Sequence, residues 1–330
     1  MTRGNEQDDT VTASIVRPGG DLSVVVVVLE GGDCLRQCLS RLERQRLRGD
    51  PEVIVPYDQR LQHVPDFIRE FPQVAFVRCE GRKTYAELRT VGILHSRGRI
   101  VAVTEDQCRP QDDWCEQVMK GHDSHHAAIG GAVEKQIPDR MLGWAIYFAD
   151  YVRYMRPMSP TLTGHLTDCN VSYKRSALDA IVSVWEKEFH EPEVHGALQA
   201  NGRTLWFDPE MVVYQRRSMG WSEALNDRWC FGRLFGSRRV VRASVVRRMA
   251  YGVAALATPL LTVLRVARNV FEKRRCVLRF TWALPALVVL NSTWALGECM
   301  GYWSGRPAAT LLPDSVAVVG QEGQEEAPPR

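Results

Sequence analysis

The sequence predicts an α/β protein with a mostly parallel sheet flanked by helices, followed by C-terminal membrane-associated helices. Three observations lead to this fold class. Strand-like and helix-like segments alternate from residue 21 to about residue 133, a spacing typical of βαβ units. Residues 22–29 form an unbroken apolar run rich in Val, as in a strand buried on both faces. Two apolar segments, 249–264 and 280–296, lie near the lower limit of about 17 residues for crossing a bilayer.

Each element follows from its period and from the residues that begin or end it. A turn at residues 30–32 precedes the first helix, which Asp33 is suited to cap. Leu and Cys then recur at helical spacing as far as Leu42, and Gly98 closes a later helix. After the first strand, we predict strands at residues 52–57, 74–77, 100–104 and 127–133, and helices at 61–70 and 84–97.

The alternation ends after Glu134. An aromatic-rich stretch is followed by residues 162–173, by helices from Ser176 and near 192–201, and by a short strand at 204–207. We predict four parts: a disordered lead at 1–20, the α/β domain at 21–237, basic and apolar membrane-associated helices at 238–305, and a disordered tail rich in Pro, Gly and Glu at 306–330.

Basic clusters precede the first C-terminal apolar segment and separate it from the second. If both segments crossed a membrane, one cluster would lie on the wrong side under the positive-inside rule. The segments therefore form a hairpin that tolerates one basic cluster on the disfavoured side, or they re-enter the membrane, or they lie in its interface. Core helices of a globular domain are the remaining alternative.

The composition is that of a globular protein. Of the 330 residues, 45% are hydrophobic and 25% are charged, enough apolar side chains for a sizeable core. A net charge of +3 argues against nucleic acid as a partner. Between Arg228 and Arg279, however, Glu272 is the only acid among many Arg and Lys residues. This local excess predicts contact with an anionic surface, most simply membrane lipids.

The cysteines and the first residues indicate the compartment. The nine cysteines include no Cys-x-x-Cys pair and no zinc-type spacing, so we expect reduced, buried thiols. The first ten residues contain no apolar run that would form a secretory signal. We therefore expect a protein of the inner (cytoplasmic) membrane with its α/β domain facing the cytoplasm.

Adjacent carboxylates follow the fourth predicted strand, in the run Thr104-Glu105-Asp106-Gln107. In open α/β folds, ligands bind at the carboxyl edge of the sheet. Carboxylates at that edge commonly hold a hard divalent cation or the polar groups of a nucleotide. A solvated acidic turn is the alternative.

Further motifs accompany this run in a fixed order. They are Glu52-Val-Ile-Val-Pro-Tyr-Asp58, Arg89-Thr-Val-Gly92, Ser96-Arg-Gly98, Pro110, Trp114, Gly130-Gly131, Asn170-Val-Ser-Tyr-Lys-Arg175, Phe189-His-Glu191, Leu198-x-x-x-Gly202 and Asp208-Pro209. The set resembles a family-2 glycosyltransferase of the GT-A fold, over residues 21–217. The resemblance implies a nucleotide-diphosphate sugar as donor, a glycan or lipid-linked acceptor, and a role in polysaccharide or glycoconjugate biosynthesis.

The resemblance also implies roles for residues at the donor site. Asp58 occupies the place of the aspartate that binds the nucleotide base, and Arg89 that of an arginine near the nucleotide, although Thr90 replaces the usual Asn. Glu105 and Asp106 would contact the nucleotide sugar. With Gln107 they match an Asp-x-Asp motif that holds Mg²⁺ or Mn²⁺. Because Gln107 replaces the second carboxylate, the motif is degenerate and metal binding is expected to be weaker.

At the acceptor site, the resemblance implies that Glu191 is the general base of an inverting transferase, matching the second acid of a Glu-Asp pair. An ordinary acid at a helix N-terminus is the alternative. His190 replaces the first acid of the pair, and Asn170 and Trp114 would also face the acceptor. Leu225 stands where the Gln-x-x-Arg-Trp motif of processive synthases has Gln, which favours transfer of single sugars.

Two other readings remain open at this point. A catalytically silent relative would bind nucleotide sugars or partners at the membrane without turnover, and the departures at residues 27–30, 90 and 107 favour it. A dinucleotide-dependent dehydrogenase would need Gly-x-Gly-x-x-Gly after the first strand, where the chain has Glu30-Gly-Gly-Asp33.

Overall fold

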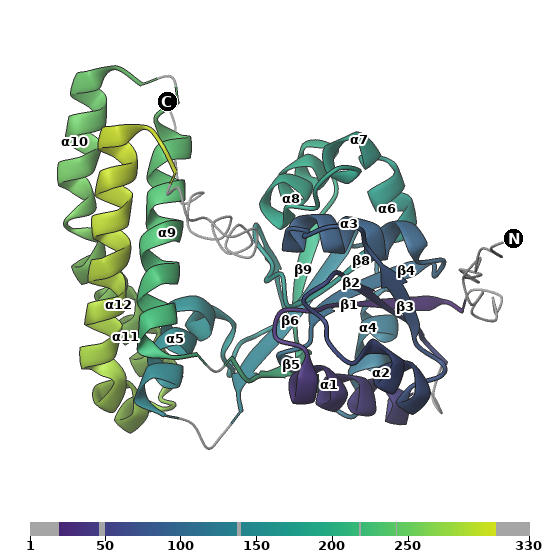
Figure 1. The fold of residues 1–330 in the computed structure, drawn as a ribbon. Coiled ribbons are helices and arrows are strands. Elements are labelled where there is room, and N and C mark those ends of the chain that lie inside the picture. The colour runs from purple at the N-terminus through teal and green to yellow at the C-terminus, as the bar shows by residue number, and fades with distance from the viewer. Residues whose placement is uncertain (1–19, 46–49, 137–139, 218, 242, 308–330) are drawn as a thin grey trace, which may run out of the picture.

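A computed structural model of the protein describes residues 20–45, 50–136, 140–217, 219–241 and 243–307. It has an α/β part and, beside it, a layer of long C-terminal helices (Figure 1). The predicted α/β fold, with helices following it at the C-terminal end, is confirmed. The disordered lead and tail predicted at 1–20 and 306–330 lie almost wholly outside the described residues.

The α/β part is built on one nine-stranded mixed sheet, with the strand order β3-β2-β1-β4-β8-β6-β9-β5 and β7 paired to β9. The strands are β1 (Leu22–Val27), β2 (Glu52–Tyr57), β3 (Ala75–Arg78), β4 (Ile100–Glu105), β5 (Cys108–Pro110), β6 (Ala128–Lys135), β7 (Thr161–Thr163), β8 (Asn170–Lys174) and β9 (Leu205–Gln215).

Strand directions bring several chain segments to one edge of this sheet. β1, β2, β3 and β4 are parallel, and β8 is antiparallel to both β4 and β6, while β6 and β9 are parallel. The carboxyl ends of β1, β2, β4, β6 and β9 therefore meet the amino end of β8 at the same edge. We call it the carboxyl edge.

Helices cover both faces of the sheet and explain why β1 is apolar throughout. Val24 and Val26 pack in the core on one face, with α1 (Gly32–Gln45), α2 (Val64–Glu70) and α4 (Trp114–Gly121). Val25 and Val27 pack in the core on the other face. That face carries α3 (Tyr85–His95), α6 (Arg175–Asp179), α7 (Val182–Trp185) and α8 (Glu191–Ala200).

β9 is longer than predicted, because it continues from Leu205 to Gln215 rather than ending at Phe207. Its pairing with β6 shifts between Gly131 and Ala132, so that residues 209–211 are accommodated in an irregularity of the strand. A Cβ on Gly131 would lie 1.8 Å from the Met211 carbonyl oxygen, which requires glycine there. The strand therefore passes the Asp208-Pro209 turn signal and reaches the carboxyl edge.

The C-terminal layer consists of α9 (Trp221–Arg239), α10 (Val245–Ala255), α11 (Thr258–Lys273) and α12 (Val277–Ser304), adjoined by α5 (Met141–Tyr151) and the 3₁₀ turn Val152–Tyr154. Partly buried polar contacts hold the layer against the α5 segment. Arg228 Nη2 on α9 donates to Asp150 Oδ1 at 2.7 Å, and Lys273 Nζ donates to the Val152 carbonyl oxygen at 2.9 Å. The domain limit predicted at 237/238 falls inside α9, and the domain limits stay a prediction.

Glycines allow α9 and α12 to approach closely. A Cβ on Gly232 would lie 2.2 Å from the Trp294 carbonyl oxygen, and one on Gly236 2.3 Å from that of Glu298. On the facing helix, a Cβ added to Gly297 or Gly301 of α12 would come equally close to a carbonyl oxygen of α9. The two Gly-x-x-x-Gly pairs therefore face each other across the contact, as in closely packed helix pairs.

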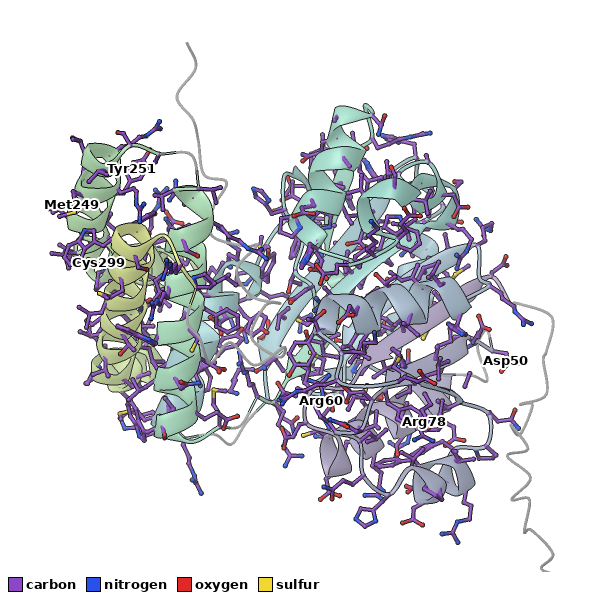
Figure 2. All side chains as sticks on the ribbon, turned by 45° about the horizontal axis from the view of Figure 1, so that its top comes forward. Asp50, Arg60, Arg78, Met249, Tyr251 and Cys299 are labelled. Carbon is purple, nitrogen blue, oxygen red and sulfur yellow. The ribbon has the colours of Figure 1, made fainter. Side chains whose placement is uncertain are left out.

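The two predicted apolar segments form helices with exposed apolar side chains. α12 is the described helix long and apolar enough to cross a membrane, and α10 with α11 passes the same test only as one span bent by 47°. We define the exposed apolar set as the large exposed hydrophobic side chains of α10, α11, α12 and the turn between α10 and α11. Its members are Val245, Val246, Met249, Val253, Leu256, Leu260, Leu261, Leu264, Phe271, Leu278, Trp282, Val288, Val289, Leu296, Met300 and Trp303. Met249 projects from the side of the layer that faces away from the α/β part (Figure 2).

Candidate active site

A fully buried arginine, Arg89 of α3, joins three carboxylates from three separate elements. Its Nη2 donates to Glu105 Oε1 at 3.1 Å and to Asp168 Oδ2 at 3.2 Å. Its Nε lies 2.9 Å from Glu191 Oε1 in an ion pair. Glu105 ends β4, Asp168 precedes β8 and Glu191 begins α8, so the carboxyl edge brings them together. Two predicted site residues, Glu105 and Glu191, thus meet a third, Arg89. We call these four side chains the Arg89 cluster.

The charges of the Arg89 cluster do not balance, because one guanidinium faces three carboxylates. Burial, with the nearby charge of Asp168, raises the pKa of Glu105 to about 8 against the opposing effect of Arg89. Burial likewise raises the pKa of Glu191 to about 7, with Arg89 lowering it and Asp168 raising it. A carboxyl group with a pKa near neutrality is suited to accept or donate a proton at cellular pH.

Asp106 has different hydrogen-bond partners from its neighbour Glu105. Its carboxylate accepts hydrogen bonds from the backbone N–H groups of Leu29, Glu30 and Gly31, at 3.0, 3.0 and 2.6 Å. These residues form the loop between β1 and α1. Burial nevertheless raises the pKa of Asp106 to about 6, against the lowering effect of the three N–H groups. Asp106 therefore holds the loop that borders the site, with both oxygens engaged.

We expect Asp106→Ala to destabilise the protein by about 3 kcal/mol, because three backbone N–H groups, that of Gly31 in a buried hydrogen bond, would lose a charged acceptor. Thermal or denaturant unfolding of the full-length protein measures the change. Asp123→Ala, which removes an exposed carboxylate, is the matched control. Equal unfolding free energies in the two variants would contradict this role for Asp106.

Gln107 is buried, and its Nε2 donates to Glu30 Oε2 at 3.3 Å. Its Oε1 has no hydrogen-bond partner among the described residues. In the part of the chain that the structure describes, no group of three or more His, Cys, Asp or Glu side chains is placed to hold a metal ion. With Asp106 engaged by the β1–α1 loop and Gln107 uncharged, the residues of the Asp-x-Asp position do not form a ready ligand set.

Asp58 follows β2 and is buried within its own network. Arg60 donates to it through the backbone N–H at 2.9 Å and through Nε at 2.8 Å, and the backbone N–H of Lys83 donates at 2.9 Å. Burial acts to raise the pKa of Asp58, but these donors lower it overall. Asp58 also lines a pocket of about 790 Å³ together with Tyr57, Arg78 and residues of α2. Arg60 and Arg78 both lie on the α/β part (Figure 2).

The residues predicted to face the acceptor occupy two different environments. His190 is partly buried, and its Nε2 lies 3.0 Å from Glu188 Oε2. It lines a pocket of about 430 Å³ between the α7–α8 segment and Arg238 of α9. Trp114 Nε1 instead donates to Asn170 Oδ1 at 2.8 Å inside the core. Asn170 Nδ2 donates to the carbonyl oxygens of Ala132 and Met211, so its hydrogen bonds are taken up within the protein.

Two charged residues near the Arg89 cluster were missed by the sequence reasoning. Asp168 is one member of the cluster itself. Arg217, at the end of β9, forms an ion pair with Asp227 at 2.8 Å, and its charge acts to lower the pKa of Glu105. No local sequence signal marks Asp168, because it reaches the carboxyl edge only through the antiparallel pairing of β8 with β4.

Comparisons with known proteins give a family match and a fold match. The sequence model described as "Glycosyl transferase family 2" matches residues 23–182. A search of curated proteins gave no match.

Among solved structures, the chain is similar to a mannosyltransferase from Pyrobaculum calidifontis in complex with GDP-Man and Mn²⁺. The TM-score is 0.50 and the identity 15%, over 83% of this chain and 86% of that one. It also matches TarS residues 1–349 from S. aureus with a TM-score of 0.45 and 12% identity, over 84% of this chain and 90% of that one.

Proposed function

The chain belongs to the family-2 glycosyltransferases, and from this premise we propose that it transfers one sugar, with inversion, from a nucleotide-diphosphate donor to an acceptor hydroxyl at the cytoplasmic face of a membrane. The observation that carries the proposal is the position of Glu191. Its carboxyl group is buried at the carboxyl edge beside Arg89, with a pKa raised to about 7.

In the proposed reaction, Glu191 accepts the proton of the acceptor hydroxyl while the hydroxyl oxygen attacks the anomeric carbon of the sugar. The bond from that carbon to the nucleotide diphosphate breaks on the opposite face, which inverts the configuration. The nucleotide diphosphate leaves with the bonding electron pair. The pocket beside His190 is the proposed place of the acceptor, because His190 adjoins Glu191 and the pocket is lined by polar side chains suited to a hydroxylated glycan.

On the donor side, Arg89 Nη1 is buried without a hydrogen-bond partner among the described residues, which supports a role toward the donor phosphates. The pocket beside Asp58 is the proposed place of the nucleotide base. For transfer of a single sugar, the support is Leu225 in place of the Gln of processive synthases. Arg228, which precedes Trp229, is engaged by Asp150 instead.

The test of the activity uses the full-length protein purified in detergent and a panel of UDP-, GDP- and dTDP-sugars, including GDP-mannose. We expect release of nucleotide diphosphate from one class of donor, and faster release when a membrane extract supplies acceptor. Proton NMR of the product would show the anomeric configuration opposite to that of the donor. Absence of turnover with every donor would contradict the proposed activity, and retained configuration would contradict inversion.

A divalent cation at Glu105, Asp106 and Gln107 stays a prediction, to be tested by substitution. Gln107→Asp adds the missing carboxylate, so we expect Mn²⁺ to raise the unfolding temperature of this variant by several degrees more than that of the parent protein. Gln111→Asp adds a carboxylate outside the run of residues 105–107 and serves as the control. An equal Mn²⁺ effect in all three proteins would place residue 107 away from any bound ion.

Membrane association is proposed from the exposed apolar set and the arginines around it. Leu260 and Leu261 of α11 are well exposed, and Arg265 and Arg268 follow on the same helix. This pairing is typical of helices that immerse apolar side chains while their cations meet anionic headgroups.

The location is tested by flotation of the full-length protein with vesicles that contain anionic lipid. We expect Leu260→Glu with Leu261→Glu to reduce the bound fraction several-fold, because each carboxylate would be taken into an apolar, anionic surface. Val182→Glu, at an exposed site on α7, should bind as the parent does. A parent protein that does not float would contradict the membrane proposal.

A further inference from the structure

Asp168 is placed to orient Arg89 rather than to meet a ligand itself. Its side chain is buried, with Oδ2 accepting from Arg89 Nη2 at 3.2 Å and Oδ1 accepting from the Thr167 hydroxyl at 3.3 Å. Glu105 accepts from the same Nη2 at 3.1 Å. Because Nη2 carries two hydrogens, one directed to each carboxylate, the plane of the guanidinium is set by the pair.

The orientation of the guanidinium plane determines which edge of Arg89 faces Glu191. With Nη2 held between Glu105 and Asp168, the Nε edge of Arg89 faces Glu191 at 2.9 Å. Asp168 also contributes a like charge close to Glu191, while Arg89 contributes the opposite charge. Arg89 therefore favours the ionised form of Glu191 and Asp168 opposes it.

We propose that Asp168 is a positioning residue of the transferase, which holds Arg89 against Glu191 and sets the ionisation of Glu191 through its own charge. The inference rests on the proposed function, in which Glu191 is the base. Without the carboxylate of Asp168, Arg89 would pair more strongly with the two remaining acids, and Glu191 would lose its proton at a lower pH.

The charged and titratable groups that act on Glu191 come from elements other than its own helix. Arg89 lies on α3, Asp168 precedes β8, and Tyr173 lies on β8. Glu105, at the end of β4, shares Arg89 with Glu191. Burial raises the pKa of Tyr173 well above its usual range, so its hydroxyl stays neutral at the pH of the experiment.

The test compares the parent protein with Asp168→Asn, which keeps the shape of the side chain and removes its charge. In the pH profile of kcat for donor turnover, we expect the acidic limb to move down by about one pH unit. A lower kcat with an unmoved limb would show a purely structural role and overturn the proposal.

A second measurement does not depend on activity. Since the pKa of Glu191 is raised in the folded protein, the folded state binds more protons than the unfolded state between about pH 4.5 and pH 7. Stability from this group is therefore present at low pH and is lost as pH rises through that range. We expect the fall of the unfolding temperature over this range to be smaller in Asp168→Asn, and parallel curves would overturn the proposal.

Two controls complete the design. Asp123→Asn, at an exposed site, should change neither the acidic limb of the kcat profile nor the pH dependence of the unfolding temperature. Asp168→Ser removes the charge while keeping a hydroxyl, and replaces the Asn variant if that variant does not fold. If the parent protein turns over no nucleotide sugar, the proposed function fails, while the unfolding curves still decide the role of Asp168.

Discussion

Glu191→Gln is expected to lower the turnover of the transferase by about a hundredfold or more, the usual contribution of a general base. The amide keeps the size of the side chain and an oxygen facing Arg89, but it cannot take a proton at neutral pH. Donor affinity, measured by calorimetry, should therefore change little while kcat falls. The ion pair between Glu191 and Arg89 lies at the first residue of α8, so loss of one charge there leaves the helix in place.

Glu43→Gln provides the matched control for this result. Glu43 is an exposed residue of α1 that lines neither the Asp58 pocket nor the His190 pocket, so the same chemical change should leave turnover at the parent level. If Glu191→Gln also kept parent turnover, Glu191 would be an ordinary acid at a helix N-terminus, favoured there by the helix dipole.

Gly232→Ala is expected to have the second large effect, on stability. The added methyl group would lie 2.2 Å from the Trp294 carbonyl oxygen of α12, and backbone cannot move aside as a flexible side chain can. α9 and α12 must then separate, at a cost of about 2–3 kcal/mol in unfolding free energy. Denaturant unfolding of the detergent-purified protein measures the loss, and Gly297→Ala should reproduce it from the other helix.

Gly196→Ala, in α8, is the control with the opposite expected sign. A Cβ at Gly196 has no atom within 4 Å in the structure. Alanine should therefore stabilise this helix by about 0.5–1 kcal/mol, because glycine in a helix loses more conformational freedom on folding. A neutral or stabilising Gly232→Ala would mean that the two helices are not held as closely as the glycines indicate.

Local patterns in the sequence were enough to predict the first half of the sheet. β2 was predicted at its observed limits, and β1 and β4 within two residues, because strands buried on both faces are apolar at every position. β5 was missed because its three residues follow the acidic run without a period of their own. β9 was cut short because Asp208-Pro209 is a turn signal, and its continuation depends on pairing with β6, which no local pattern encodes.

The site residues likewise include some that local sequence patterns predict and some that depend on the folded sheet. Arg89, Glu105 and Glu191 could be found because each stands in a motif at the end of a predicted element, and the structure places them in contact. Asp106 could be placed at the edge but not given its partners, since these are backbone N–H groups of a distant loop. Asp168 depends on β8 being antiparallel to β4, a property of the whole sheet rather than of the residues around it.

The close contact between α9 and α12 limits how deep the C-terminal layer can sink. α9 carries Asp227, Arg228, Arg233 and Arg238, and its glycines, Gly232 and Gly236, allow it to lie close against α12. A bilayer that enclosed α12 on all sides would also enclose α9, and each buried charge at mid-depth costs about 2.5–3.5 kcal/mol on insertion scales. In the membrane location proposed above, the exposed apolar set would enter the lipid while the charged side chains of α9 would keep that helix at the headgroup level. The pairing of α9 with α12 therefore favours binding in the membrane interface over a full crossing by α12.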